Sequence, residues 1–259
     1  ASISGTITGG GGSDDYVIDS DDYSLSEDEL GGVDVVRSSV SFILGDHFEH
    51  LFLTGGGDIS GRGNAAGNEL TGNDGDNALF GRGGTDVLTG NDGADRFNGG
   101  SGSDSVSYLS AAAGVIVNLA TGKASGGDAD GDRFVAIEDL GGSNFNDRLT
   151  GSKGDNSLVG EGGKDVLAGG KGSDSLFGGA GADTFVFATG DGKDFVSDFS
   201  KADTDRIDLS DFSAVTSFAD LKANHMDQDG GAVIITAGKD ALTLFNIDIA
   251  DLVKSDFIF

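Results

Sequence analysis

The sequence predicts an all-β protein whose chain winds into a solenoid, and three observations carry this prediction. Nonapeptides that begin with glycine repeat without insertion over residues 63–107 and again over 142–186. In every one the sixth residue is Asp or Asn and the eighth is apolar. The chain also holds 47 glycines and no proline among its 259 residues. High glycine content in a strict period favours a solenoid over a disordered linker.

Each nonapeptide divides into a tight turn and a short strand. Its first six residues are rich in Gly and Asp, and glycine adopts backbone angles that other residues resist. Its last three residues hold one apolar side chain between two outward-facing ones, which is the pattern of a minimal strand. Eighteen residues therefore make one full coil, and each nonapeptide stacks on the one two places further along, with the eighth positions facing inward.

The sixth positions of the nonapeptides predict cation sites along the edges of the solenoid. Stacking aligns their carboxylates, and the turn carbonyls add further oxygens, so the sites suit a hard cation of calcium's size. Without a cation the aligned charges repel one another. The sixth residues are Asn68, Asn77, Asp86, Asp95 and Asp104 in the first block, and Asp147, Asn156, Asp165, Asp174 and Asp183 in the second.

The nonapeptide resembles the Gly-Gly-x-Gly-x-Asp-x-apolar-x repeat of the RTX (repeats-in-toxin, haemolysin-type) calcium-binding proteins. The resemblance implies a right-handed parallel β-roll, or β-helix, solenoid with Ca²⁺ between successive turns. It further implies a secreted, extracellular protein exported by a type I secretion apparatus. The chain departs from the family pattern at Ala66 and Phe145, which replace the fourth-position glycine. Weaker sites are expected where Asn68, Asn77 and Asn156 replace the acid.

Pairing alternate nonapeptides predicts roughly six Ca²⁺ ions, with one or two more at the ends of the blocks. The predicted pairs are Asn68/Asp86, Asn77/Asp95, Asp86/Asp104, Asp147/Asp165, Asn156/Asp174 and Asp165/Asp183. The turn glycines expected at these sites are Gly83, Gly100, Gly102, Gly162, Gly170, Gly172, Gly179 and Gly181. Outside the two blocks, Asp14 and Asp194 are predicted as further metal ligands.

The chain is expected to divide into five segments. These are N-terminal capping coils with one RTX-like motif (1–62), the first calcium block (63–107), inter-block strands (108–141), the second calcium block (142–186), and a C-terminal cap with a secretion signal (187–259). The extra motif is Gly9–Val17, with Asp14 at the acid position and Tyr16 at the apolar one.

Elements outside the two blocks follow from local patterns. β-Branched and aromatic residues predict strands at Val33–Leu44, Leu51–Leu53, Val115–Leu119 and Phe134–Leu140. Ser217–His225 is predicted to be a short helix capped by Ser217. Ala232–Thr236 and Ala241–Ile247 are predicted to form a hairpin.

Two acidic segments leave alternatives open. Asp128, Asp130 and Asp132 resemble the start of an EF-hand loop, but Asp139 stands where the twelfth-position Glu belongs. The segment is therefore either an extra ion site or a polar turn. Asp191 and Asp198 either complete the last calcium site together with Asp194 or belong to solvated loops.

The two ends of the sequence bear on export. Residues 252–259, LVKSDFIF, resemble the uncleaved export signal of RTX proteases and related enzymes. Residues 1–12, ASISGTITGGGG, carry neither the basic region nor the apolar core of a Sec signal peptide. Together they predict Gram-negative type I export without an N-terminal signal peptide.

Composition and motif searches exclude several function classes. A net charge of −28 argues against nucleic acid and anionic membranes as partners, and no segment is apolar enough to span a membrane. The absence of Cys excludes disulfides and thiolate metal sites. There is no Gly-x-Ser-x-Gly or P-loop lysine motif, and His47 and His50 match no zinc-hydrolase spacing. No catalytic residue is predicted, and this stretch is expected not to be an enzyme.

Three functions fit these observations. The first is a calcium-binding RTX module that folds on calcium binding after secretion. The second is a calcium-dependent module that binds an extracellular polysaccharide or another surface ligand. The third is the C-terminal part of a secreted protease, lipase or alginate epimerase.

Overall fold

The computed structural model describes residues 5–29 and 31–259, and these residues form two compact units of parallel β-solenoid. The first unit comprises Ala1–Tyr108 and Gly122–Ile137, and the second Leu109–Thr121 and Glu138–Phe259. Residues 1–4 and Leu30 lie outside the described residues. The first four belong to the segment 1–12 that was searched for a signal peptide, and Leu30 belongs to the predicted capping coils. No helix in the described ranges is long and apolar enough to cross a membrane.

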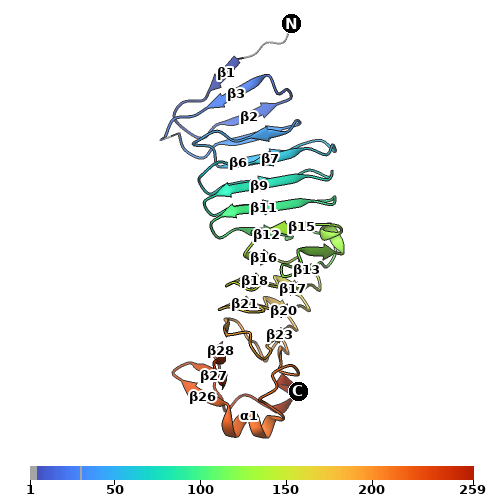
Figure 1. Ribbon diagram of the computed structural model, residues 1–259, viewed down its shortest axis with the longest axis vertical. Coiled ribbons are helices and arrows are strands. Elements are labelled where there is room, and N and C mark those ends of the chain that lie inside the picture. Colours follow the sequence, from blue (N-terminus) through green and yellow to red (C-terminus); the bar gives the residue numbers. More distant parts are fainter. Residues whose placement is uncertain (1–4, 30) are drawn as a thin grey trace. The chain divides into compact units, whose positions relative to one another are not determined.

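The first unit winds between two parallel sheets, whose strands succeed one another along the coil (Figure 1). One sheet contains β2 (Asp15–Ile18), β4 (Val35–Ser38), β6 (His50–Leu53), β8 (Glu69–Thr71), β10 (Val87–Thr89) and β12 (Ser105–Ser107). The other contains β5 (Phe42–Ile43), β7 (Ser60–Arg62), β9 (Ala78–Gly83), β11 (Arg96–Ser101) and β15 (Arg133–Val135). Separately, β1 (Gly5–Thr8) pairs in parallel with β3 (Tyr23–Ser26), and β14 (Lys123–Ser125) lies antiparallel to β15.

The second unit repeats this plan. Its first parallel sheet contains β16 (Asp139–Gly141), β18 (Ser157–Val159), β21 (Ser175–Phe177), β24 (Lys193–Val196) and β28 (Asp240–Phe245). Its second contains β13 (Ile116–Asn118), β17 (Arg148–Thr150), β20 (Val166–Ala168), β23 (Thr184–Val186), β25 (Arg206–Asp208) and β29 (Phe257–Ile258). A short pair, β19 (Gly162–Gly163) and β22 (Ala180–Gly181), joins two successive turns.

The strand register equals the predicted coil of eighteen residues. Leu70 pairs with Leu88, and Leu88 with Val106. In the second unit Leu149 pairs with Leu167, and Leu167 with Phe185. All ten eighth-position side chains are at most 1% exposed, and burying each stabilises the fold by about 1.5–3 kcal/mol. The solenoid prediction is therefore confirmed, and its core is a stack of single apolar residues.

The predicted helix and hairpin near the C-terminus are present in the second unit. Helix α1 (Phe218–Asn224) begins at Ser217, whose Oγ accepts a hydrogen bond from the Asp220 N–H at 3.2 Å. The predicted hairpin forms from β27 (Ala232–Ala237) and β28, with β26 (Met226–Asp229) antiparallel to β27. At the end of the chain a 3₁₀ turn (Lys254–Asp256) leads into β29, where Phe257 is buried.

Two predicted strands are each divided in the structure. Val33–Leu44 contains β4 and β5, separated by a bend in which Ser38 Oγ donates to the Val40 carbonyl at 2.7 Å. Phe134–Leu140 contains β15 and β16, which belong to different units. Ala136 lies between them with a φ of 49°, and this left-handed conformation cannot continue a strand. The predictions of single strands were therefore wrong, because the apolar content of a segment does not reveal where its backbone turns.

Candidate metal centres

Sixth-position residues one coil apart are joined by a backbone-to-side-chain hydrogen bond. The N–H of the earlier residue donates to Oδ1 of the later one, and all six predicted pairs show this bond. The distances are 2.7 Å for Asn68/Asp86 and Asn77/Asp95, 2.9 Å for Asp86/Asp104 and Asp165/Asp183, and 2.8 Å for Asp147/Asp165 and Asn156/Asp174. The spacing of eighteen therefore aligns these side chains in rows along the turns.

The rows continue beyond the nonapeptides through residues that the repeat does not mark. Asp132 Oδ1 accepts from the Asp95 N–H at 2.7 Å, although the two residues are 37 apart in sequence. Asp205 Oδ1 accepts from the Asp183 N–H at 2.9 Å, across 22 residues. The predicted ligand Asp194 accepts from the Asp174 N–H at 3.1 Å. Sequence reasoning missed Asp132 and Asp205 as members of these rows because loops of irregular length bring them there.

The segment around Asp132 forms a polar turn. Gly127–Ala129 is a 3₁₀ turn, and Asp132 Oδ2 accepts from the Tyr108 hydroxyl at 2.6 Å. Both carboxylate oxygens of Asp132 thus have hydrogen-bond donors from the protein. This arrangement favours the polar-turn interpretation of residues 126–132 over an EF-hand-like ion site.

Six of the aligned carboxylates keep one buried oxygen that has no hydrogen-bond partner in the described structure. The six atoms are the Oδ2 atoms of Asp86, Asp95, Asp165, Asp174, Asp183 and Asp194. All six side chains are at most 1% exposed. A buried carboxylate oxygen without a partner is costly, so each of these atoms indicates a place where a cation fits.

These six carboxylates lie in turns of one backbone type, here called open turns. In an open turn the residues four and two places before the Asp both have left-handed φ. Arg82 and Gly84 have φ of 83° and 94°, and Gly179 and Gly181 have 88° and 139°. Glycine adopts a left-handed φ most readily, which explains why it is favoured at the fourth position.

The first glycine of an open turn borders the free oxygen. A Cβ added to Gly81 would collide with Asp86 Oδ2 and lie 2.6 Å from the Gly99 carbonyl oxygen. On Gly160 it would lie 2.5 Å from both Asp165 Oδ2 and the Gly178 carbonyl oxygen. Carboxylate and carbonyl oxygens thus converge beside a residue with no side chain. We did not name these first-position glycines as ligands from the sequence, although glycine opens all ten nonapeptides.

The glycines predicted at the metal sites lie at the second, third and fourth positions of their turns. Gly100, Gly170 and Gly179, at the second position, and Gly102, Gly172 and Gly181, at the fourth, lie against backbone carbonyls of the preceding coil. Gly172, for example, would place a Cβ 2.7 Å from the Gly154 carbonyl oxygen. Gly83 and Gly162, at the third position, have more room, with nearest atoms at 3.3 and 3.8 Å. These glycines allow the coils to approach one another.

Four turns, at 63–68, 72–77, 142–147 and 151–156, are closed by hydrogen bonds within the turn. The N–H of the second residue donates to the side-chain oxygen of the sixth, over 2.7 Å in Asn64/Asn68 and 2.6 Å in Ser152/Asn156. The side chain of the second residue accepts from the fourth N–H, as Asn64 Oδ1 does from Ala66 at 2.8 Å. These closed turns are the first two turns of each repeat block.

The sixth side chains of the closed turns have their remaining polar atoms satisfied. Asn68 Nδ2 donates to the Phe48 carbonyl at 2.8 Å, and Asn156 Nδ2 donates to the Glu138 carbonyl at 2.7 Å. Asp147 accepts from the Ser143 N–H and hydroxyl and from the Val115 N–H. Sites involving Asn were expected to be weaker, and here the protein itself fills the hydrogen-bonding capacity that a cation would use.

Burial governs the electrostatics of the open turns. It raises the pKa of Asp95, Asp165 and Asp194 to about 7. It raises the pKa of Asp86 and Asp174 to about 6. Neighbouring carboxylates raise these pKa values further, whereas the hydrogen bond from the preceding backbone N–H opposes the shift. The open turns therefore favour a positive ion or a proton.

Three other acids that the sequence singled out lie elsewhere. Asp198 accepts from the N–H groups of Gly178 and Gly179 at 2.9 and 2.7 Å, and Asp191 Oδ2 accepts from the Ala188 N–H at 2.6 Å. Both thus have backbone donors. Asp14, predicted as a ligand in the extra motif, lies just before β2 and faces two other acids from the N-terminal coils.

Comparison with known proteins agrees with the geometry of the turns. The family model of the RTX calcium-binding nonapeptide repeat, with four copies, matches residues 71–106, 141–176 and 159–193. The first match lies in the first unit and the other two in the second. A search of curated proteins gave no match.

Two similar solved structures are a lipase and an epimerase subunit. The extracellular lipase LipA from Serratia marcescens is 16% identical with a TM-score of 0.33, over 85% of this chain and 45% of the lipase. The AlgE6R3 subunit of the Azotobacter vinelandii mannuronan C5-epimerase is 29% identical with a TM-score of 0.39, over 47% of this chain and 77% of the subunit. This chain thus corresponds to less than half of the lipase.

The family match covers all ten nonapeptides in whole or in part, and it includes five of the six aspartates with a free oxygen; Asp194 lies one residue beyond it. All-oxygen sites at buried aspartates are the chemistry that Ca²⁺ prefers. The chain carries RTX calcium-binding nonapeptide repeats in both of its units, and it is a calcium-binding β-roll module.

Proposed function

We propose that Ca²⁺ binds at the open turns and that its binding drives folding of both units. The observation that carries this proposal is the set of buried carboxylate oxygens without partners at Asp86, Asp95, Asp165, Asp174, Asp183 and Asp194. Their number agrees with the roughly six ions expected from stacked nonapeptides. A divalent ion at each would replace the missing partner and neutralise the charge.

At Asp86 and Asp165 the candidate ligand oxygens come from two consecutive coils. Asp86 Oδ2 and the Gly99 carbonyl converge beside Gly81, and Asp165 Oδ2 and the Gly178 carbonyl converge beside Gly160. Asp104 and Asp147 hold the same motif position and extend the two rows. The closed-turn residues Asn68, Asn77 and Asn156 border the rows and are proposed as the weakest contributors. Calcium accepts such mixed sets of carboxylate and carbonyl oxygens.

The free energy available from these sites is large enough to control folding. Extracellular calcium modules bind with dissociation constants of about 10⁻⁴–10⁻³ M. At a tenfold excess of free ion each site adds about 1.4 kcal/mol, so six sites add about 8 kcal/mol. Total domain stabilities are about 5–15 kcal/mol. The folded state would therefore depend on calcium at millimolar concentrations and lose this term at low cytosolic calcium.

This dependence supports secretion by a type I apparatus to the extracellular space. A chain without calcium would stay unfolded and could be threaded through a narrow exporter, and it would fold where calcium is abundant. The C-terminal segment fits this order of events. In the folded second unit Phe257 is buried and pairs with Ile207, so part of the proposed export signal is covered once this unit folds.

A calcium-dependent ligand-binding surface is a second candidate. Phe195 and Phe245 stack with ring centroids 6.0 Å apart on the outer side of the second unit, and they are 36% and 39% exposed. Stacked exposed rings offer a flat apolar face of the kind that a sugar ring covers. A glycan array with and without calcium tests this candidate. Whether the chain is the C-terminal part of a protease, lipase or epimerase is tested by the sequence preceding it.

Circular dichroism tests the main proposal directly. The chain is expected to lack strand signal in excess EDTA and to gain it cooperatively on titration to millimolar Ca²⁺. Mg²⁺ at the same concentration serves as a control, because it prefers a smaller octahedral shell that retains water. An equally strong strand signal in EDTA and in calcium would overturn the proposal.

A further inference from the structure

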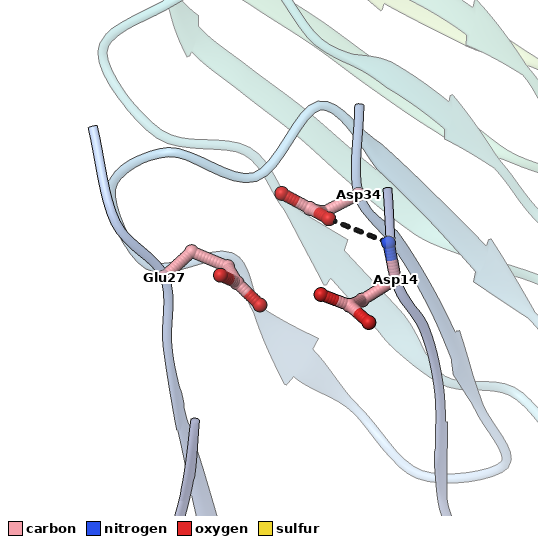
Figure 2. A group of neighbouring side chains, drawn as sticks. All are labelled: Asp14, Glu27 and Asp34. Atoms are coloured by element: carbon pink, nitrogen blue, oxygen red, sulfur yellow. Dashed lines mark hydrogen bonds between the residues drawn. The ribbon is translucent and has the colours of Figure 1, made fainter. Parts of the chain in front are cut away.

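A cluster of three carboxylates lies outside the nonapeptide blocks, at the ends of the first strands of the first unit. Asp14 immediately precedes β2, Glu27 immediately follows β3 and Asp34 immediately precedes β4. One carboxylate oxygen from each residue lies within 4.8 Å of the others (Figure 2). The sequence analysis identified Asp14 alone, since Glu27 and Asp34 fall at no repeat position.

Two of the three side chains are buried, and each has one carboxylate oxygen without a hydrogen-bond partner among the described residues. Glu27 is 7% exposed and Asp34 is 0% exposed. Asp34 Oδ1 accepts from the Asp14 N–H at 2.8 Å, and Glu27 Oε2 accepts from the Gly10 N–H at 3.2 Å. The other oxygens, Asp34 Oδ2 and Glu27 Oε1, have no hydrogen-bond partner among the described residues.

The hydroxyl of Tyr16, a neutral side chain, lies beside the same carboxylate cluster. Tyr16 is 7% exposed, and its hydroxyl is also buried without a partner in the described structure. A Cβ added to Gly9 would collide with Tyr16 Oη and with Glu27 Oε1, and it would lie 2.6 Å from Asp14 Oδ2. Oxygens from three side chains therefore converge beside Gly9, much as a carboxylate and a backbone carbonyl oxygen converge beside Gly81 in an open turn.

The charges of the cluster are not balanced by a neighbouring base. Among the described residues, the nearest base in sequence, Arg37, pairs with Asp15 at 3.2 Å and lies over the ring of Phe52. No ion pair of Asp14, Glu27 or Asp34 occurs in that part of the chain. Three carboxylates held this close favour a cation, because partly buried like charges repel strongly.

We propose that Asp14, Glu27 and Asp34 bind a divalent cation of calcium's class, with the Tyr16 hydroxyl as a neutral oxygen beside it. Calcium–oxygen distances of about 2.3–2.6 Å allow ligands on opposite sides of the ion to be about 5 Å apart, which accommodates this cluster. The site links the turns around β2, β3 and β4, so the ion would hold the N-terminal coils of the first unit together.

This site is independent of the proposal for the nonapeptide turns. Its ligands are 13 and 7 residues apart, not eighteen, and two of them come from segments without the repeat. It would bind its ion even if the open turns did not. Failure of one proposal therefore leaves the other standing.

Terbium luminescence on the full chain tests the site, because Tb³⁺ replaces Ca²⁺ at oxygen sites and is sensitised by a nearby tyrosine. The chain has three tyrosines and no tryptophan, so sensitised emission reports on few places. The double substitution Glu27→Gln with Asp34→Asn is expected to lose one bound Tb³⁺ per chain and much of the emission. Glu29→Gln, an exposed acid two residues away, is the matched control and should change neither.

A second variant keeps the test decisive if the double variant fails to fold. Tyr16→Phe retains the ring that packs edge-on against Phe48, with centroids 5.6 Å apart, and removes only the hydroxyl. It is expected to fold and to lower the sensitised emission. The proposal is overturned if Tyr16→Phe leaves the emission unchanged, or if a folded double variant binds as many Tb³⁺ ions as the unsubstituted chain. Strand signal in Ca²⁺, measured in parallel, reports on the nonapeptide turns separately.

Discussion

The turns that begin each repeat block differ from the turns that end it, although all share the nonapeptide pattern. In the closed turn at 151–156 the Asn156 side chain bonds to the Ser152 N–H, and its amide donates to the Glu138 carbonyl. In the open turn at 160–165 the residues Glu161 and Gly163 adopt φ of 73° and 132°, and Asp165 Oδ2 has no partner. In a closed turn the protein itself satisfies the polar atoms of the sixth side chain, whereas an open turn keeps a buried carboxylate oxygen without a partner among the described residues.

The place of a turn in the stack accounts for the difference. Every open turn of the two blocks packs on the nonapeptide that lies one coil earlier. The closed turns have no nonapeptide one coil earlier. Gly163 approaches the carbonyl of Phe145 in the preceding coil, and Gly172 approaches that of Gly154. An earlier turn thus supplies the surface on which the left-handed turn packs. Where no such turn precedes, side-chain hydrogen bonds close the backbone instead.

The largest effect that would sharpen this comparison is expected from pH in the metal-free protein. Burial raises the folded-state pKa of five open-turn aspartates (Asp86, Asp95, Asp165, Asp174 and Asp194) from the ordinary 3.8 to about 6 or about 7, and it also raises that of Asp183. Between these values the folded chain binds more protons than the unfolded chain, so its stability is full at low pH and is lost as pH rises through about 7. In EDTA, the strand signal should therefore be greater at about pH 5 than at about pH 8.

Saturating calcium should reverse the direction, because protons then compete with the ion for the same oxygens. Urea titrations at the two pH values, with and without calcium, provide the measurement. Equal stability at both pH values in EDTA would show that the open-turn carboxylates do not carry the instability of the metal-free fold.

The next largest effect is expected from an alanine at the fourth position of an open turn. Gly181 has a φ of 139°, and a Cβ there would collide with the Gly163 carbonyl oxygen. Strained backbone and overpacking together predict that Gly181→Ala costs about 3 kcal/mol or more. Its matched control is Gly154→Ala in a closed turn, where the nearest atom is 4.0 Å away and φ is not left-handed.

The control is expected to change the free energy of unfolding by about 0.5 kcal/mol or less. Urea denaturation of both variants in saturating calcium measures the difference. Similar costs for the two variants would contradict the division into open and closed turns.

An intermediate effect is expected from exchanging the sixth residues of the two turn types. Asp165→Asn removes a charged ligand from an open turn and should lower the number of bound Ca²⁺ ions by one. Asn156→Asp adds a charge to a closed turn, but it replaces a donor to the Glu138 carbonyl with an acceptor. It should therefore cost about 1–3 kcal/mol without adding an ion. Equilibrium dialysis with calcium counts the ions, and an extra ion in Asn156→Asp would refute the prediction.

The smallest effect is expected from weakening a closed turn at its second residue. Ser152 Oγ accepts from the Gly154 N–H at 3.2 Å. Ser152→Ala should cost about 1 kcal/mol, as the loss of one hydrogen bond does. Because the polar atoms of this turn already have protein partners, the cost should be nearly the same at threshold and at saturating calcium. A cost that grows as calcium is lowered would indicate that the turn takes part in calcium binding.

Much of the fold could be predicted from the sequence because the period is short and strict. The spacing of the eighth positions determines the register, since a side chain such as Leu88 can be buried only if it stacks on Leu70 and Val106. Ser217 likewise marks the start of α1 through its own hydrogen bond. Such features depend on neighbours at a fixed separation, and the sequence displays that separation directly.

The amino-acid sequence by itself therefore determined the coil of eighteen residues, the inward apolar row and the aligned carboxylates. Only the tertiary structure decided which turns are open and which acids join the rows from outside the repeats. Asp132, Asp205 and the Glu27–Asp34 pair reach their places through loops of unequal length. Asn91 adopts the left-handed conformation in an open turn while Asn73 closes its own turn. The residue is the same in both, and the difference is the coil on which each turn packs.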